Sequence, residues 1–358
     1  MSHRTTVAAR KPLALALLAS VLAFPVLVSP DPQEDPRHGP NREDEPRAKS
    51  FSLRRAVAFT DAAARDWERS YRCVTCHTNG LYLAARASVS TKSTNYRRAR
   101  TFAQEYLERY VVEKEKPSGQ RGALEGIVAT TCFLTLSDMQ TNKRLSAITR
   151  RALKHMWSVQ DADGAWGDWL KCGWPPFESD DHFGVTLAAI AVGATPPSYR
   201  RTSTAKEGTR RMLSWLQAHP PQNLHHKGMM LWAATSMKDI ADAATRSQWS
   251  AELLAMQRED GGWRLADLGA GTWKRPKDTL AELPSDAYAT AFAVLVLRKA
   301  DIPANHEQLV RGLQWLRKEQ RKSGRWYVRS PKRDGKHFIS HAATMFGVMA
   351  FRACGERL

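Results

Sequence analysis

Charged amphipathic segments alternate with more apolar segments along most of the chain. In the charged segments apolar residues recur at helical spacing, and Arg, Lys and Glu fill the opposite face, as in residues 311–318. The apolar segments are rich in Ala, Val and Leu, as in residues 184–191. This alternation predicts six hairpins, each with an outer charged helix and an inner apolar helix. The predicted pairs are 54–71 and 81–90, 97–115 and 124–139, 147–160 and 181–193, 206–218 and 228–240, 246–257 and 286–299, and 306–320 and 340–352.

Inner helices with so little polar surface must be buried on most sides. Six hairpins meet this requirement when they close into a ring, with the inner helices lining a lumen and the outer helices facing water. We therefore predict an all-α fold, an (α/α)6 toroid, formed as a single domain by residues 50–358. In such an up-and-down ring, every turn from an outer to an inner helix lies on the same rim.

The turns of three hairpins share a short motif. Residues 160–166 read Q-D-A-D-G-A-W, residues 257–263 read Q-R-E-D-G-G-W, and residues 320–326 are a weaker copy. Gly permits a tight reversal, Asp or Ser caps backbone donors, and Trp packs against the turn. This pattern resembles the QW repeat of the squalene–hopene cyclase and protein prenyltransferase superfamily, over roughly residues 54–352. The resemblance implies a toroid like one of the two barrels of squalene–hopene cyclases.

Residues 73–77 read C-V-T-C-H, which is the attachment pattern of c-type haem. Cys73 and Cys76 would form thioethers to the haem vinyl groups, and His77 would be the proximal iron ligand. The alternatives are a Cys73–Cys76 disulfide and half of a zinc site. Since the three remaining cysteines form no second C-x-x-C, we expect no zinc and predict covalent haem c.

The haem motif falls in the first turn from an outer to an inner helix. Aligning residues 79–82 (N-G-L-Y) on residues 163–166 (D-G-A-W) makes this turn a modified QW turn. The iron needs a second ligand or an open face, and ring closure puts the sixth hairpin beside the first. We favour His341 as a metal ligand because it begins the inner helix of that hairpin. The other candidates for this position are His337, His225, His226, Met229 and Met230.

The N-terminus has the pattern of an export signal. Three basic residues within positions 4–11 precede an uncharged apolar run of 16 residues, Leu13 to Val28. This run is short for a membrane span and typical of a signal peptide. We predict a signal peptide or N-terminal anchor over residues 1–29 and a disordered tether over residues 30–49. The protein would be exported, either periplasmic or anchored facing the periplasm.

The formal net charge of +18 favours anionic partners. A membrane surface and an acidic redox partner protein fit this charge, and so does a plain solvated surface. Because the charges are scattered and the chain is predicted to be exported, we expect no nucleic acid as a partner.

Polar residues begin the third inner helix. Residues 178–181 read E-S-D-D, which is similar to the D-x-D-D motif of class II terpene cyclases. The resemblance implies that Asp180 stands where those enzymes have a proton donor, with Asp181 and Glu178 beside it. The alternative role of Asp180 and Asp181 is to cap the helix and to stabilise its dipole.

The prenyltransferases of the same superfamily hold zinc with Asp, Cys and His. Asp286 and His341 match the Asp and the His by position, but Tyr288 stands where the Cys is expected. This departure also argues against zinc.

Aromatic residues are frequent in the third and fifth turns, at Trp166, Trp169, Trp174, Phe177, Trp263 and Trp273. They would suit an apolar, isoprenoid-like ligand, although packing of long loops explains them equally well. Our first hypothesis is a toroid with haem on its rim that acts in electron transfer or as a haem-dependent oxidoreductase. The alternatives are a terpenoid cyclase, which is an isomerase, and a non-catalytic binding module.

Overall fold

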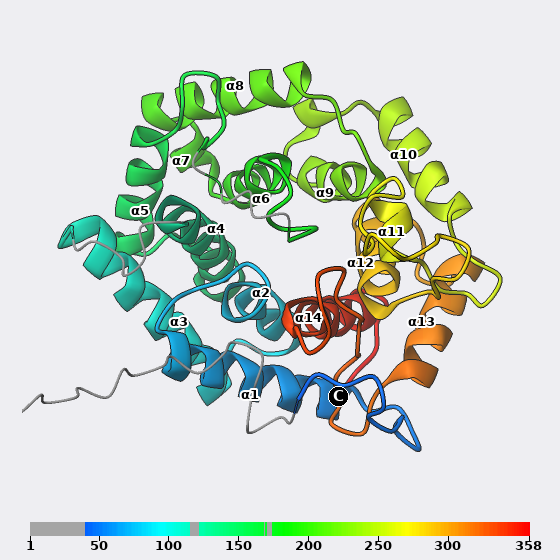
Figure 1. Ribbon diagram of the computed structural model, residues 1–358. Helices are drawn as coiled ribbons and strands as arrows, with labels where there is room; N and C mark the ends of the chain where they lie inside the picture. The colour runs from blue at the N-terminus through cyan, green and yellow to red at the C-terminus, as the bar shows by residue number, and fades with distance from the viewer. Residues whose placement is uncertain (1–39, 115–121, 168, 170–173) are drawn as a thin grey trace, which may run out of the picture. The chain divides into compact units, whose positions relative to one another are not determined.

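The computed structural model describes residues 40–114, 122–167, 169 and 174–358. The chain divides into two compact units, Met1–Asp31 and Pro32–Leu358, and every described residue belongs to the second. In this unit an inner ring of helices is surrounded by an outer ring (Figure 1). The inner helices are α2 (Asn79–Val89), α4 (Ala123–Asn142), α6 (His182–Gly193), α9 (Leu224–Ala234), α12 (Ala287–Lys299) and α14 (Phe338–Ala353). The outer helices are α1 (Leu53–Tyr71), α3 (Thr94–Leu107), α5 (Ala147–Ser158), α8 (Ser203–Ala218), α10 (Ala243–Ala255) and α13 (Glu307–Glu319).

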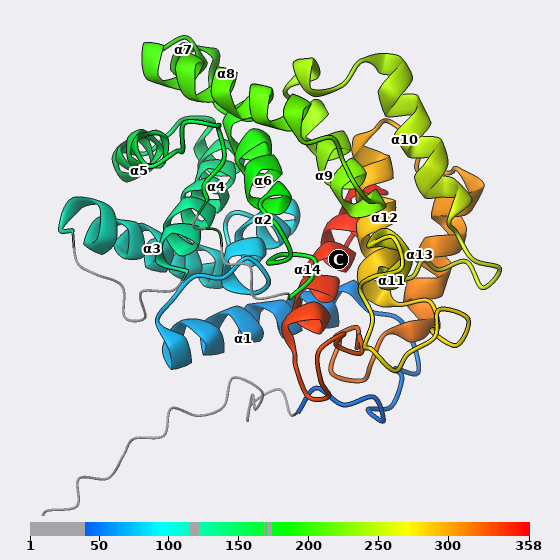
Figure 2. The ribbon, with the colours of Figure 1, turned by 45° about the horizontal axis from the view of Figure 1, so that its top comes forward.

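The inner helices contact one another all the way round the ring. Each packs on the next along the chain, and contact between α14 and α2 closes the circle, so the sixth hairpin lies beside the first (Figures 1 and 2). Each outer helix also packs on the inner helix of the preceding hairpin, as α1 does on α14 and α5 does on α4. The predicted (α/α)6 toroid and its six hairpins are confirmed.

Local sequence explains where many of these helices begin. A Ser, Thr, Asn or Asp side chain accepts a hydrogen bond from a backbone N–H of the first turn and replaces a partner that the helix itself cannot supply. These N-caps are Ser52, Ser93, Ser146, Thr202, Asn223, Asp242 and Asp286. The shorter elements are a π turn at Glu108–Val112, α7 (Pro197–Arg200), a 3-10 turn at Lys238–Ile240 and α11 (Leu265–Leu268).

The core lies between and inside the inner helices. Every residue of α6 is buried, which explains its lack of a polar face. Rings from α9, α12 and α14 meet inside the circle: the ring centres are 4.3 Å apart for His225 and Phe292, and 5.6 Å apart for Phe292 and Phe346. Aromatic side chains therefore fill this part of the lumen.

Three turns with the QW motif connect neighbouring outer helices. Gln160 Nε2 donates to the carbonyl of Gly164 in its own turn and to that of Gly208 on α8. Gln257 and Gln320 make the equivalent bonds, to Gln308 on α13 and to Ser52 before α1 respectively. In each turn the buried Trp donates its indole N–H to a carbonyl of the preceding outer helix, at Met156, Leu253 and Leu316. The predicted structural role of this motif is confirmed.

The first turn differs from the modified QW turn that the alignment predicted. The glycines of the three QW turns have φ between +89° and +105°, whereas Gly80 lies inside α2. A Cβ at Gly80 would lie 2.7 Å from the carbonyl oxygen of Thr75 and 2.7 Å from the ring of Phe133. Tyr82 also departs from the Trp pattern, because its hydroxyl donates to Asp61 on α1. Gly80 is thus required for close packing and not for a reversal.

Residues 40–49 are ordered against the sixth hairpin, which corrects that part of the predicted disordered tether. Glu45 pairs with the buried Arg325 at 2.6 Å, and Ala48 N–H donates to the carbonyl of Gln320. The sequence suggested disorder because this segment has few apolar residues, but its polar groups find partners in the turn after α13. The predicted signal peptide, residues 1–29, and the tether before residue 40 lie outside the described residues. Among the described helices, none has the length and apolarity that a membrane crossing requires.

Candidate functional site

The C-x-x-C-H segment forms the turn between α1 and α2. Helix α1 ends because Arg72 adopts a left-handed conformation, and its N–H donates to the carbonyl of Glu68. Asn79 then fixes the turn from its far side: its Oδ1 accepts from Thr75 N–H at 3.0 Å, and its Nδ2 donates to the carbonyl of Cys73 at 2.9 Å. These bonds hold the motif on the rim at the mouth of the ring.

Both thiols of the motif are free of disulfide bonds. Cys73 is half-buried, while Cys76 is only 3% exposed and its Sγ lies 3.9 Å from Glu125 Oε1 on α4. Burial raises the pKa of the Cys76 thiol well above its usual value, and the nearby carboxyl groups of Glu125 and Glu178 raise it further. The site therefore favours a neutral sulfur over a thiolate.

His77 sits in a cluster of rings from three elements. Its ring centre lies 5.1 Å from that of Trp67 on α1, 6.0 Å from that of Phe338 on α14, and 6.4 Å from that of Phe177 in the third turn. Burial lowers the pKa of His77 well below its usual value, so the imidazole is neutral, the form that binds metals.

Thr78 links His77 to α14. The Thr78 hydroxyl is hydrogen-bonded to His77 Nδ1 at 2.7 Å and to His341 Nδ1 at 3.2 Å. Since His77 Nδ1 is engaged, Nε2 is the nitrogen left for an iron bond, and a partner on the other ring nitrogen is the usual support of a metal-binding histidine. Sequence reasoning missed Thr78 and Trp67, although Thr78 directly follows the motif.

The structure places His337 close to His77. It immediately precedes α14, and its ring centre lies 6.0 Å from that of His77 and 4.5 Å from that of His341. His341, the favoured ligand in the sequence, instead contacts Thr78 and the edge of the Phe59 ring. The ring closure that the sequence predicted thus brings both histidines to the motif.

The donor set at this turn fits c-type haem. It offers two thiols outside any disulfide, one neutral imidazole with its Nδ1 already bonded, and a second imidazole on the adjacent hairpin. The third turn covers this group, because Trp174 packs on Phe338 with ring centres 4.6 Å apart.

The carboxylates of the E-x-D-D segment have different described neighbours. Asp180 Oδ1 accepts from the N–H of His182, and its Oδ2 pairs with His226 Nε2 at 3.1 Å. These partners lower the pKa of Asp180 despite partial burial. Asp181 occupies the N-cap position of α6 without a capping side-chain bond, and Glu178 lies close enough to Cys76 to affect its thiol.

Tyr288, which replaces the cysteine expected in a prenyltransferase, belongs to the lumen. Its hydroxyl is hydrogen-bonded to His225 Nε2 at 2.9 Å.

Within the described part of the chain, no three His, Cys, Asp or Glu side chains are arranged to hold a metal ion among themselves.

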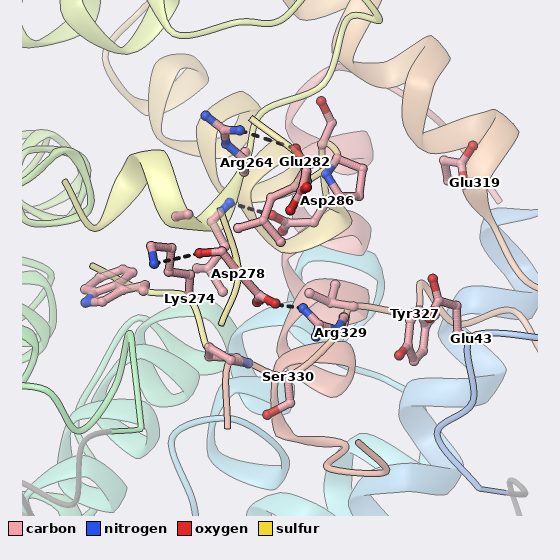
Figure 3. Close-up of a pocket in the computed structure, with 18 of the residues that line it drawn as sticks. Glu43, Arg264, Lys274, Asp278, Glu282, Asp286, Glu319, Tyr327, Arg329 and Ser330 are labelled. Carbon is pink, nitrogen blue, oxygen red and sulfur yellow. Dashed lines mark hydrogen bonds and ion pairs between the residues drawn. The ribbon is translucent and has the colours of Figure 1, made fainter. Parts of the chain in front are cut away.

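A cleft of about 540 Å³ opens on the same rim between the fifth and sixth hairpins (Figure 3). Aromatic and charged side chains line it, and Arg329 pairs there with Asp278 at 2.7 Å. Burial raises the pKa of Asp286, at the start of α12, to about 6. Among the described residues that line the cleft, none belongs to the C-x-x-C-H or E-x-D-D segments.

No protein-family model and no curated protein matches this sequence. Solved structures with similar folds do match. The unsaturated glucuronyl hydrolase of Bacillus sp. GL1 is 12% identical, with a TM-score of 0.53, and the match covers 84% of this chain and 96% of that one. A polysaccharide lyase is 11% identical, with a TM-score of 0.53, and the match covers 85% and 97%.

A diphosphate synthase also matches. The ent-copalyl diphosphate synthase of Streptomyces platensis is 14% identical, with a TM-score of 0.50, and the match covers 77% of this chain. The chain spans only 50% of the length of that enzyme. At these identities the likeness establishes the fold alone: the chain is an α/α toroid of the kind found in terpene cyclases and in saccharide-degrading enzymes.

Proposed function

We propose that this protein is an exported α/α toroid that carries covalent haem c on Cys73 and Cys76, with His77 as the proximal ligand, and that it acts in electron transfer. The observation that carries the proposal is the state of the motif: two free thiols beside a neutral imidazole whose Nδ1 is held by Thr78. Haem bound there would supply one-electron redox chemistry. The chain itself would orient the imidazole and surround the group with apolar rings.

The surroundings of Cys76 support a thioether over the alternatives. A thioether sulfur is neutral and tolerates burial beside Glu125, whereas a zinc-bound thiolate would add a negative charge at a site that already disfavours one. The half-buried Cys73 and the buried Cys76 are linked by no disulfide. The net charge of +18 supports an acidic redox protein or an anionic membrane surface as the partner.

The test is production of the full chain together with the c-type haem maturation machinery. We expect absorption bands of a c-type haem that persist after acid–acetone extraction, and their loss in Cys73→Ala/Cys76→Ala protein. The matched control is Cys132→Ala, which removes a buried free cysteine of α4 outside the motif and should keep the bands. Bands that survive in the double variant would refute covalent attachment at this turn.

A second candidate function, terpenoid cyclisation, rests on the pair of Asp180 and His226 at 3.1 Å. In this proposal the pair would hold the proton that is delivered to an isoprenoid-like substrate. Turnover of squalene that disappears in Asp180→Asn protein, with haem content unchanged, would support it. An absence of turnover in the unmodified protein would exclude it for this substrate.

A further inference from the structure

We propose that the mouth of the ring opposite the C-x-x-C-H turn binds a single-chain amphiphile with an anionic head group, such as a fatty acid. A pocket of about 370 Å³ lies there, lined by the C-terminal halves of all six inner helices, and we call it the far pocket. The C-x-x-C-H turn precedes the start of α2, so the two sites lie at opposite ends of the ring. This proposal does not rest on haem binding.

The floor of the far pocket is apolar. Its deepest lining side chains are at most 8% exposed and come from four inner helices: Leu136, Ile190, Leu295 and Met349. Trp232 of α9 also lines the pocket, and its ring meets the ring of Phe346, with centres 6.5 Å apart. The volume falls in the range of about 300–1,000 Å³ that is usual for small-molecule pockets. A hydrocarbon chain inserted here would be surrounded by apolar side chains.

Three cationic side chains line the same pocket, at Lys143, Lys299 and Arg352. Among the described residues of the lining there is no Asp or Glu, so no carboxylate of the pocket neutralises them. Arg352 is held in place because its Nε donates to the carbonyl of Ser88 at 3.0 Å. Burial lowers the pKa of Lys299, and the nearby guanidinium of Arg298 lowers it further. An anionic head group at this mouth would supply the missing negative charge.

The far pocket differs in this respect from the cleft on the other rim. In that cleft Arg329 pairs with Asp278, and Arg47 pairs with Glu319, so carboxylates of the protein already neutralise cations there. The helix dipole alone favours cations at the C-terminal ends of helices. It does not explain why an apolar pocket stays open beside them. An apolar floor and unneutralised cations together are complementary to a hydrocarbon chain with an anionic head.

The experiment is calorimetric titration of the full-length protein with octanoate, decanoate and laurate. We expect saturable binding that tightens by up to about fourfold for each added methylene, because each one leaves water for the apolar floor. Decanol has the chain length of decanoate without its charge and should bind about tenfold more weakly. Added salt should weaken the binding of decanoate much more than that of decanol.

Substitutions test where the amphiphile binds. The double variant Lys143→Gln/Lys299→Gln should bind decanoate more weakly by about tenfold or more. Lys206→Gln, which changes an exposed lysine of α8 outside the pocket, should bind as the unmodified protein does. Met139→Glu adds a carboxylate to the half-buried part of the lining and should abolish binding, whereas Met139→Leu should retain it.

Three results would overturn the proposal. Unmodified protein that shows no saturable binding of any of the three carboxylates would do so. Equal affinity for decanoate in the unmodified protein, the double lysine variant and Met139→Glu would place the amphiphile elsewhere. Binding to vesicles of anionic phospholipid but not to dissolved laurate, lost in the double lysine variant, would make this mouth a membrane-docking surface and not a ligand pocket.

Discussion

Two aspartates begin helices in the same way but in different surroundings. Asp242 accepts from the N–H of Thr245 at the exposed start of α10, and Asp286 accepts from the N–H of Ala289 at the buried start of α12. The hydrogen bond lowers the pKa of Asp242, whereas burial outweighs it at Asp286 and raises the pKa to about 6. The sequence predicts that each residue can cap a helix. Burial decides whether the pKa is raised or lowered, and burial depends on the fold.

The two carboxyl groups should give stability opposite pH dependences. Because folding raises the pKa of Asp286, its protonated form favours the folded state. This contribution to stability is complete below about pH 3.8 and is lost as the pH rises to about 6. The free energy of unfolding of the unmodified protein minus that of Asp286→Asn should therefore decrease between pH 4 and pH 6. The decrease should be on the order of 2 kcal/mol, since a pKa difference of 1 corresponds to about 1.4 kcal/mol.

Asp242→Asn is the matched control. Because the pKa of Asp242 is lowered from 3.8, the corresponding difference should be flat between pH 4 and pH 6 and should fall below pH 4. Denaturant unfolding at a series of pH values measures both differences. The same trend in the two variants would show that burial at the rim does not control these carboxyl groups.

At the scale of elements, the QW turns hold consecutive outer helices together. Gln320 is the strongest case: its amide exchanges two hydrogen bonds with the backbone of Ser52 and donates a third to the carbonyl of Gly324. Through these bonds the turn after α13 is joined to the start of α1. The end of the described ring is thereby connected to its beginning.

Replacing Gln320 with Ala should destabilise the protein by about 2–4 kcal/mol. The side chain is fully buried, and its loss removes the partner of the Ser52 N–H and one partner of each of the Ser52 and Gly324 carbonyls. Thermal or denaturant unfolding measures the loss. Gln248→Ala on α10 is the control, because this exposed side chain bonds only to Glu252 among the contacts described for it, and its loss should cost less than about 0.5 kcal/mol. Equal effects would contradict the connecting role of Gln320.

The hairpins could be predicted from sequence because periodicity records which face of a helix is buried. The conformation of the first turn could not be predicted in this way. Asn79 and Gly80 were aligned with the Asp-Gly pair of a QW turn, but Gly80 instead allows close packing against Phe133. Residues 40–49 were misjudged for a related reason: the partner of Glu45 is Arg325, 280 positions away. Local composition does not contain such pairings.

At the scale of the whole unit, ring closure carries the functional argument. The sequence predicted that the sixth hairpin would lie beside the first, and contact between α14 and α2 confirms it. His337 directly precedes α14, and His341 lies one helical turn further along, within it. Ring closure brings both near the motif, and the sequence argument favoured His341.

The central claim is that residues 73–77 hold covalent haem at the mouth of the toroid. The most direct measurement is the mass of the tryptic peptide spanning residues 73–86, released from full-length protein made with the haem maturation machinery. Our account predicts a peptide that carries one haem through both cysteines. A peptide of unmodified mass, or one lighter by two hydrogens as in a Cys73–Cys76 disulfide, would contradict it.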